Sequence, residues 1–451
     1  MVMDMTTGSP IRRILRFFIP VMLGNLLQQF YSMADSAIVS RTLGINAFAG
    51  VTATGALNFL ILGFALGICS GFAIPVSQEF GAGNHSAMRR CFANALYTAG
   101  VIAVAIGSAT SLLSGTILRL IGTPEDILPY SLAYIRVIFA GIPATMLYNL
   151  LAGVMRAVGD GRTPLYMLII STILNVVFDL AFIIVFHMGI AGAAYATILS
   201  QLISGLLCAI VIRRKFSILQ ISGDEWQYDF ASCKRLLGIG LPMGLQFSIT
   251  AIGSTIIQSA VNSLGSQAVA AIGTGARVQF VFTTPLEAIG VTMATYCGQN
   301  LGARRIDRVR TGVRQITIVM LIYCICAFAL ELLVGRYIAL LFVDAAETLI
   351  LGRATLYLSI VIAMSPLLAI VLIYRNAIQG VGYSRVAMIA GLMELIGRAF
   401  VAWVLVGLFD YTGACFANPI AWFCADIFLV PAYFVIIRKL ERENNAKSQT
   451  N

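Results

Sequence analysis

Charged residues are scarce in this sequence: Asp, Glu, Lys and Arg together make up 11% of its 451 residues. Soluble domains are about a quarter charged, and they do not repeat apolar runs of about twenty residues along the chain. The scarcity of charge therefore excludes an ordinary soluble domain and indicates a polytopic membrane protein. Each charge that remains inside an apolar run needs an explanation, because burying it in a bilayer costs free energy.

Histidine is scarce as well, and the cysteines follow no metal-binding or redox spacing. The chain has two histidines and nine cysteines, and they form neither a CxxC pair nor a Cys/His cluster at zinc spacing. We therefore expect no zinc site and interpret the cysteines as small buried side chains. The sequence also lacks HExxH, Asp-rich prenyl-transfer and P-loop motifs, so it does not predict an enzyme.

Twelve apolar segments are long enough to cross a bilayer, at roughly twenty or more residues each. Each should be a helix, because no water in the membrane core can satisfy the backbone of an open strand. The segments are 17–40, 49–77, 91–117, 131–151, 164–186, 190–212, 237–263, 268–297, 316–334, 356–379, 386–408 and 412–437.

Basic residues alternate between the connections. One set of connections is rich in arginine and lysine, as at 12–16, 213–215 and 304–310, whereas the other set contains Arg41, Arg119, Arg336 and Arg353. Because basic loops stay in the cytoplasm, both termini are expected to be cytoplasmic. The net charge of +10 thus reflects membrane orientation, and we expect no binding to nucleic acid.

The two halves of the chain repeat. Pro20 and Pro242 are 222 positions apart, Pro143 and Pro366 are 223 apart, and Gly192 and Gly413 are 221 apart. The repeat predicts two six-helix bundles, 1–222 and 223–451. An even number of spans per repeat relates the bundles by a pseudo-two-fold axis along the membrane normal, which in transporters places a substrate site between halves that alternate in access. The expected fold class is therefore an all-α polytopic membrane protein with twelve transmembrane helices.

Asp35, late in the first span, is a functional-site hypothesis, because an acid at the bilayer centre costs about 2.5–3.5 kcal/mol. The fifth span carries Asn175 and Asp179 at i, i+4 spacing, on one helix face, and the sixth carries Thr197. At 1.5 Å per residue, the three helices hold Asp35, Asp179 and Thr197 about 9–12 Å below their outer ends. The shared depth predicts one polar site, with Gln28 two turns from Asp35 on the same face.

This site can couple an ion to a conformational change in either of two ways. Two carboxyl groups in a low-dielectric pocket do not both ionise cheaply, so at least one should hold a proton near neutral pH. Alternatively, carboxylate, amide and hydroxyl oxygens replace the water shell of Na⁺. The structural alternative is a self-satisfied polar cluster that only holds helices together.

Other polar residues lie within the later spans. Glu287 either attracts cations to a central cleft or pairs with Arg277. Glu394 and Arg398 are at i, i+4 spacing and should pair with each other. Arg375 is interpreted as a cap at the inner end of its helix, and Asp426 has no assigned role.

The sequence resembles the multidrug and toxic compound extrusion (MATE) family, of the bacterial DinF and NorM type. The resemblance covers nearly the whole chain and rests on the order and spacing of several motifs. They are Pro20 and Asp35 fifteen residues apart, Arg156-Ala-Val-Gly-Asp-Gly-Arg-Thr-Pro164, Asn175-x-x-x-Asp179, Gly192-Ala-Ala-Tyr-Ala-Thr197 and Gln299-Asn-Leu-Gly302.

The resemblance implies a multi-pass protein of the bacterial cytoplasmic membrane that exports organic cations and amphipathic drugs in exchange for H⁺ or Na⁺. It implies no further cofactor, and we expect a functional monomer in the lipid bilayer. It assigns the N-lobe cation site to Asp35, Asn175, Asp179 and Thr197. Its substrate cavity would include Gln28, Asn149 and Glu287, and Pro20 would be the point at which the first helix bends.

One departure from the family concerns the seventh span. Many members carry a Glu eight residues after its proline, where this chain has Thr250, which favours coupling through the N-terminal half. Two alternatives to multidrug export remain: a flippase for a lipid-linked precursor, and an exporter of a narrow native metabolite. A flippase should show a cleft rich in cationic side chains, whereas the N-terminal half offers acids.

Overall fold

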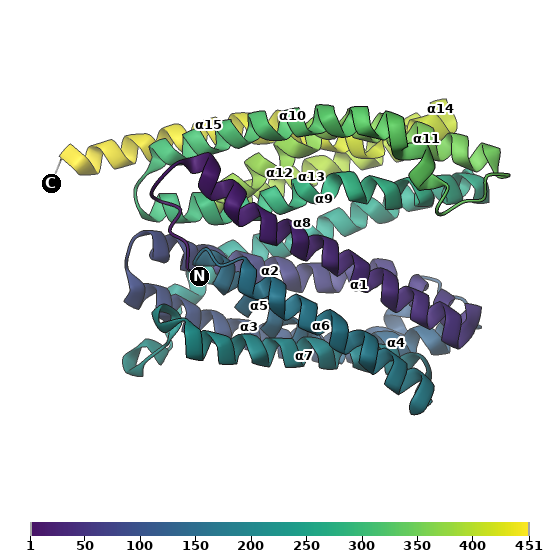
Figure 1. Cartoon of the computed structure of the whole chain (residues 1–451), viewed down its shortest axis with the longest axis horizontal. Helices are drawn as coiled ribbons and strands as arrows, with labels where there is room; N and C mark the ends of the chain where they lie inside the picture. The colour runs from purple at the N-terminus through teal and green to yellow at the C-terminus, as the bar shows by residue number, and fades with distance from the viewer. Residues whose placement is uncertain (1, 450–451) are drawn as a thin grey trace. The chain divides into compact units, whose positions relative to one another are not determined.

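The computed structural model describes residues 2–449, apart from the side chains at positions 34, 37, 45, 46 and 447–449. All regular secondary structure in these residues is helical, and it comprises fifteen α-helices, two π-helices and two 3-10 helices (Figure 1). The expectation of an all-α protein is therefore confirmed for the described part of the chain.

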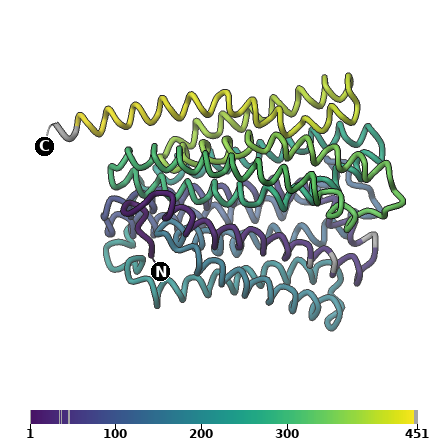
Figure 2. The backbone as a smooth tube through the Cα atoms, turned by 45° about the horizontal axis from the view of Figure 1, so that its top comes forward, coloured from purple at the N-terminus to yellow at the C-terminus, as the bar shows by residue number. Residues whose placement is uncertain are grey.

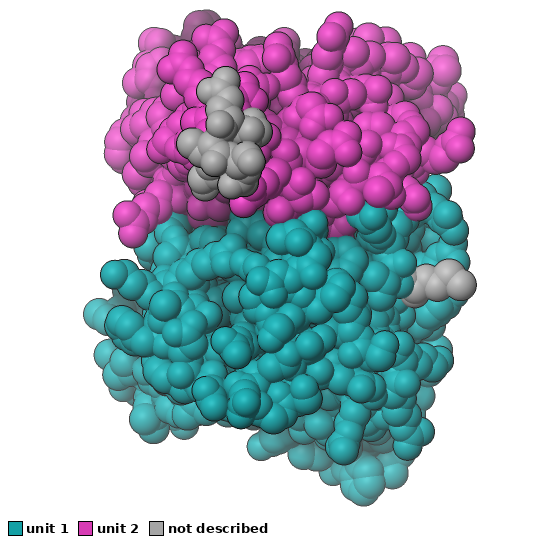
Figure 3. Space-filling view, turned by 90° about the vertical axis from the view of Figure 1, so that its left-hand side faces the viewer, with its two compact units in different colours: residues 1–5, 16–245 teal, residues 6–15, 246–451 magenta. Residues whose placement is uncertain are grey.

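The chain forms two compact units. Unit 1 comprises Met1–Met5 and Arg16–Leu245, and unit 2 comprises Thr6–Leu15 and Gln246–Asn451 (Figure 3). The units change over within a helix that starts at Phe230. They are defined by packing, whereas the predicted domains 1–222 and 223–451 are defined by the repeat, so that domain boundary stays a prediction.

Unit 1 is built around α2 and α5, which pack against each other (Figure 1). Large apolar side chains at the centre, such as Ile68, Phe72, Phe139 and Met146, are almost completely buried. Within a membrane these side chains stabilise the bundle by close van der Waals packing, because lipid tails are as apolar as the side chains themselves. The helices are α1 (Pro10–Ala53), α2 (Gly55–Gly81), α3 (His85–Leu120), α4 (Leu128–Ala140), α5 (Ile142–Ala157), α6 (Arg162–Leu180), the π-helix η1 (Ala181–Val185) and α7 (Gly189–Lys215).

Unit 2 pairs α9 with α12 and α13 with α15. Figure 2 shows that the end of α15 extends beyond the other helices of this unit. The helices are α8 (Phe230–Ser263), whose first half belongs to unit 1, α9 (Ser266–Gly302), α10 (Ile306–Ala339), α11 (Thr348–Ala363), α12 (Ser365–Gly380), α13 (Ser384–Phe400), the π-helix η4 (Val401–Leu405), α14 (Val406–Cys415) and α15 (Ala417–Gln449).

The predicted spans lie mostly in helices, although 49–77 begins in α1 and 412–437 begins in α14. Eight helices are long and apolar enough to cross a membrane, and two bent helix pairs bring the number to ten among the described residues. The remaining two predicted spans lie in α1 and α9, which have 44 and 37 residues. A helix of 20 residues is about 30 Å long, the thickness of the hydrocarbon core, so both are long enough.

Two predicted spans are bent rather than straight. Segment 131–151 divides into α4 and α5 with a bend of 48°, and segment 356–379 divides into α11 and α12 with a bend of 47°. Pro143 and Pro366 each lie in the first turn of the second helix. Proline lacks an N–H and is tolerated there, but it cannot continue the preceding helix. The repeat-related prolines thus bend repeat-related spans.

The connection between α7 and α8 is fixed to α3. It contains the short helices η2 (Ser217–Leu219) and η3 (Gly223–Trp226). Arg89 of α3 donates from Nε to Glu225 Oε2 at 2.7 Å, and this hydrogen bond lowers the pKa of Glu225 to about 2. Asn94, also on α3, accepts from the backbone N–H of Asp229 at 2.9 Å. The segment that joins the two repeats is therefore ordered in this structure.

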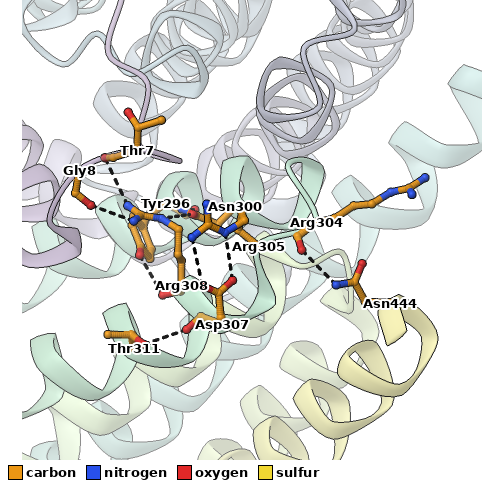
Figure 4. A network of polar contacts seen from close by, with 10 residues as sticks. All are labelled: Thr7, Gly8, Tyr296, Asn300, Arg304, Arg305, Asp307, Arg308, Thr311 and Asn444. Carbon is orange, nitrogen blue, oxygen red and sulfur yellow. Dashed lines mark hydrogen bonds and ion pairs between the residues drawn. The ribbon is translucent and has the colours of Figure 1, made fainter. Parts of the chain in front are cut away.

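Residues 2–15 form an N-terminal strap with one anchor in each unit. In unit 1 the Met3 N–H donates to Val158 O at 3.2 Å. In unit 2 Arg308 donates from Nη1 to Gly8 O at 2.8 Å and from Nη2 to Thr7 O at 3.3 Å. Figure 4 shows this arginine between the strap and the end of α9. The strap therefore takes part in the packing of both units.

Candidate functional site

The structure brings together the four residues predicted to bind the coupling cation. Asp35 comes from α1, Asn175 and Asp179 come from α6, and Thr197 comes from α7. The Asp35 and Asp179 carboxyl groups lie close enough to interact electrostatically. The Asn175 amide donates from Nδ2 to Thr197 Oγ1 at 3.5 Å. All four lie in unit 1, so their arrangement depends on the packing of one bundle.

Burial makes this cluster energetically demanding. Asn175 and Asp179 are completely buried, whereas Asp35 is half-buried. Asp35 Oδ1, Asn175 Oδ1 and both carboxyl oxygens of Asp179 accept no hydrogen bond from another described residue. Buried polar atoms in native proteins are nearly always hydrogen-bonded. The unmet oxygens therefore argue against a self-satisfied cluster and for a site that takes up a proton or a cation.

The backbone of α6 changes directly after the acidic residue. Two residues beyond Asp179, the helix widens into the π-helix η1, and the end of α13 in unit 2 widens in the same way into η4. Such π segments within helices frequently occur at functional sites. Within α6, the i, i+4 spacing of Asn175 and Asp179 places both side chains on the buried face.

Two tyrosines near the cluster were not predicted. Tyr31 lies one helical turn before Asp35, and its hydroxyl group lies near Thr197 and Ser200. Tyr134 of α4 is buried and lies close enough to both acids to interact electrostatically. The i, i+4 spacing could have identified Tyr31. No local signal identifies Tyr134, because it approaches from a helix that is distant in sequence.

Two predicted cavity residues of unit 1 lie outside these contacts. Gln28 is exposed on α1. Asn149 of α5 is half-buried and donates from Nδ2 to Thr145 O of its own helix at 2.8 Å. Their assignment to a substrate cavity stays a prediction.

Pro20 lies inside α1, and the helix continues through it. It faces the start of α6, since a Cβ atom added to Gly161 would lie 3.2 Å from Pro20 Cγ. The adjacent turn is held by Asp160, which accepts from Arg162 N at 2.9 Å and from Thr163 Oγ1 at 2.7 Å. Bending of α1 at Pro20 stays a prediction.

Unit 2 contains fewer of the residues predicted to bind the cation or the substrate. Glu287 of α9 is exposed, and its suggested partner Arg277 lies over the ring of Phe342, 5.7 Å from the centroid. Thr250 of α8 donates to Gln246 O of its own helix at 3.1 Å. Arg375 of α12 lies close enough to Glu287 to act on it electrostatically. The role of Glu287 as a cavity residue stays a prediction.

The expected pair on α13 is present, with one addition. Arg398 Nη2 lies 3.3 Å from Glu394 Oε2, and Arg375 Nη1 lies 2.7 Å from Glu394 Oε1. The interpretation of Arg375 as a helix cap is therefore wrong. Arg375 of α12 contacts Glu394 of α13 instead. An arginine within a membrane span is stabilised by pairing with an acid, because an unpaired charge there is costly.

Among the described residues, no group of three or more His, Cys, Asp or Glu side chains is placed to hold a metal ion. The cluster predicted to bind the cation offers two carboxyl groups with amide and hydroxyl oxygens. Such hard oxygen ligands suit a proton or an alkali cation better than a transition metal.

Comparisons with known proteins agree with this architecture. The family model MatE matches residues 20–181 and again residues 242–404. The two matched stretches begin 222 positions apart, as do Pro20 and Pro242. The sequence repeat is thus found independently by the family model.

Several curated relatives are transport proteins. A probable multidrug resistance protein of Bacillus subtilis, YpnP, is 30% identical over 406 residues, which cover 89% of this chain and 88% of the relative. A protein of Shewanella oneidensis named FAD transporter is 25% identical over 313 residues, which cover 68% of this chain and 69% of that protein.

Solved structures share the fold. A crystal structure of a MATE protein in complex with MaL6 superposes with a TM-score of 0.89 at 21% identity and covers 97% of this chain and 99% of its own. An outward-facing multidrug resistance MATE transporter has a TM-score of 0.88 at 22% identity and covers 96% of this chain and 97% of its own. These neighbours have twelve helices in two lobes, which confirms the predicted fold class. With the family model matched across both halves, the chain belongs to the MatE family of multidrug and toxic compound extrusion transporters.

Proposed function

We propose that this multidrug efflux transporter is a secondary active antiporter, which exports organic cations and amphipathic compounds in exchange for H⁺ or Na⁺. The single observation that carries the proposal is the pair of acids in unit 1, Asp35 and Asp179, with carboxyl oxygens that have no donor among the described residues. A proton between the two groups turns their repulsion into a hydrogen bond. The occupied and empty states therefore differ in charge and in packing.

Coupling follows from competition for this site. When the proton leaves, two carboxylates remain close to each other, and a cation is needed to balance their charge. Either the coupling ion or a cationic substrate supplies that charge. Asn175 and Thr197 add oxygens to the same site, and these would serve Na⁺. A single site that binds the coupling ion or the substrate, but not both at once, is sufficient for exchange, provided each ligand favours a different conformation.

The remaining assignments follow from the same proposal. Residues 1–222 form the lobe with the coupling site, residues 223–451 form the second lobe, and access alternates between the two sides of the bacterial cytoplasmic membrane. Both termini lie in the cytoplasm, and the monomer is the functional unit. Gln28, Asn149 and Glu287 line the substrate path, and Pro20 allows α1 to bend next to Gly161.

A narrower substrate range is the second candidate. The relative named FAD transporter indicates that a similar chain can carry one defined metabolite. The two arginines that pair with Glu394 would suit a substrate with an anionic group. Competition of FAD with dye export would favour this candidate over a multidrug range.

The test is export of ethidium from proteoliposomes under a proton gradient or a sodium gradient imposed separately. Asp35→Asn keeps the shape of the side chain and removes its charge, and it should reduce gradient-driven export at least about tenfold. Asp344→Asn, at an exposed acid in the connection between α10 and α11, is the matched control and should export normally. The gradient that drives the wild type identifies the coupling ion.

Two outcomes would contradict the proposal. Unchanged export by Asp35→Asn would show that coupling does not use the acids of unit 1. If neither gradient moved ethidium in the wild type, the result would argue against cation export, and lipid-linked precursors and FAD would then be tested in the same vesicles.

A further inference from the structure

A second buried charged cluster lies in unit 2. It combines residues of four helices: Gln246 of α8, Arg375 and Gln379 of α12, Glu394 and Arg398 of α13, and Asp426 of α15. The exposed fractions are 3% for Glu394, 6% for Arg398 and 8% for Asp426. Charges buried to this degree within membrane-spanning helices mark functional sites more often than structural ones.

The cluster lies at the place on the repeat that corresponds to the site of unit 1. Ser171 and Asn175 of α6 are each 223 positions before Glu394 and Arg398 of α13, the same offset that relates Arg162 to Arg385. Both α6 and α13 continue into a π-helix. The two repeats therefore place polar side chains at equivalent positions, although the residue types differ.

The charges of the cluster do not balance within its hydrogen bonds. Glu394 uses one oxygen for Arg375, at 2.7 Å, and the other for Arg398, at 3.3 Å. One amide atom of Gln246 lies 3.2 Å from both Nη1 and Nε of Arg375, and the other lies 2.6 Å from Gln379 Nε2. Two guanidinium groups thus share one hydrogen-bonded carboxylate, which leaves one guanidinium charge without an ion pair of its own. Glu287 of α9 also acts on Arg375 electrostatically, but the two form no ion pair in the described part of the chain.

Asp426 is the residue that could pair with the second guanidinium group, but it forms no hydrogen bond to it. Neither of its oxygens has a hydrogen-bond partner among the described residues. The charged and titratable groups that act on it are Glu394 of α13 and Arg375 and Tyr374 of α12. In the described part of α10, α14 and η4, which also pack against α15, no titratable group acts on it. A bare carboxylate is not expected in such a place, because a buried ion needs a partner.

We propose that Asp426 is a second proton-binding site, in which the neutral carboxyl group is the form present in this structure. Release of the proton to water leaves a carboxylate that takes over Arg375, while Glu394 keeps Arg398. Each guanidinium group of the cluster then has one carboxylate as its own partner. The geometry supports this exchange because Arg375 acts on both acids, and Glu394 retains a second guanidinium on its own helix. The site is separate from Asp35 and does not depend on the proposed export activity.

The test is infrared spectroscopy of the full-length protein in lipid, which resolves the C=O stretch of protonated carboxyl groups. The wild type at neutral pH should show such a band that disappears in Asp426→Asn and persists in Asp35→Asn and in the exposed control Asp344→Asn. Asp426→Glu should shift the band and keep it. A spectrum of Asp426→Asn that retains the whole protonated-carboxyl intensity would overturn the proposal.

A stability measurement provides the second check. Since Asn resembles the neutral acid, Asp426→Asn should fold and should be at least as stable as the wild type at pH 7. The wild type should lose thermal stability as pH rises, because ionisation of a buried acid disfavours the folded state, and Asp426→Asn should lose less. A variant that fails to fold, or that keeps the full pH dependence, would contradict a neutral Asp426.

Discussion

Replacement of Arg308 by alanine tests the anchor of the N-terminal strap in unit 2. The guanidinium donates to Gly8 O at 2.8 Å, to Thr7 O at 3.3 Å and to Asn300 Oδ1 at 3.0 Å (Figure 4). A hydrogen bond from a charged group contributes about 1.5–3 kcal/mol when both partners are buried, as Arg308 and Asn300 are. The two strap carbonyls belong to exposed residues, where water competes, so together they add at most about 1 kcal/mol.

The expected loss for Arg308→Ala is therefore about 2–4 kcal/mol of unfolding free energy. Arg308→Lys should recover little, because an ammonium group cannot reach three acceptors in the fork geometry of arginine. The matched control is Arg305→Ala, which removes an exposed arginine 3.2 Å from the exposed Asp307 and should leave the unfolding free energy almost unchanged.

Chemical unfolding in detergent measures the energies, and hydrogen exchange locates the effect. In Arg308→Ala the backbone amides of residues 6–15 should exchange faster, whereas those of α5 and α6 should not change. Equal destabilisation by the two alanine variants would refute the reasoning, because it would mean that burial of the donor makes no difference. Unchanged exchange in residues 6–15 would show that the strap is held by other contacts.

Two further changes test the other parts of unit 1. Gly159→Ala should destabilise the protein by more than about 2 kcal/mol, because Gly159 has φ 83° and its added Cβ would collide with Met3 O. The control is Gly83→Ala, at φ 71° with open space around it, which should cost only about 1 kcal/mol. Thermal or chemical unfolding measures both. Because the bond from Arg89 lowers the pKa of Glu225 to about 2, its contribution should be complete above about pH 4.5 and should be lost as the pH falls toward 2, and Glu225→Gln should remove this part of the acid dependence of unfolding.

The extent of the helices follows from the sequence, because apolar length alone decides which segments can cross a bilayer. The bends do not follow from the sequence, because a count of hydrophobic residues identifies 131–151 and 356–379 as single spans. Pro143 and Pro366 were recognised as repeat partners, yet a proline inside a span ends a helix only where neighbours can satisfy the freed carbonyls. That condition is tertiary, and the sequence pattern does not contain it.

The cluster in unit 1 was predictable because depth along a helix is proportional to residue number. Counting from the helix ends placed Asp35, Asp179 and Thr197 at one level, and the structure brings them together. Depth does not say which helices are neighbours. Tyr134 was therefore missed and Arg375 was wrongly interpreted as a helix cap, because both contact their partners from helices that become neighbours only after the bundle has packed.

The strap has a consequence for the order of assembly during synthesis. Gly8 and Arg308 are 300 residues apart, so at about 5–20 residues per second the ribosome supplies Arg308 about 15–60 s after Gly8. Met3 meets its partner Val158 much earlier. Until Arg308 is made, the leading residues of the chain can therefore bond only to the first half, through Val158. Docking of residues 6–15 requires that translation has passed Arg308, within the second half of the protein.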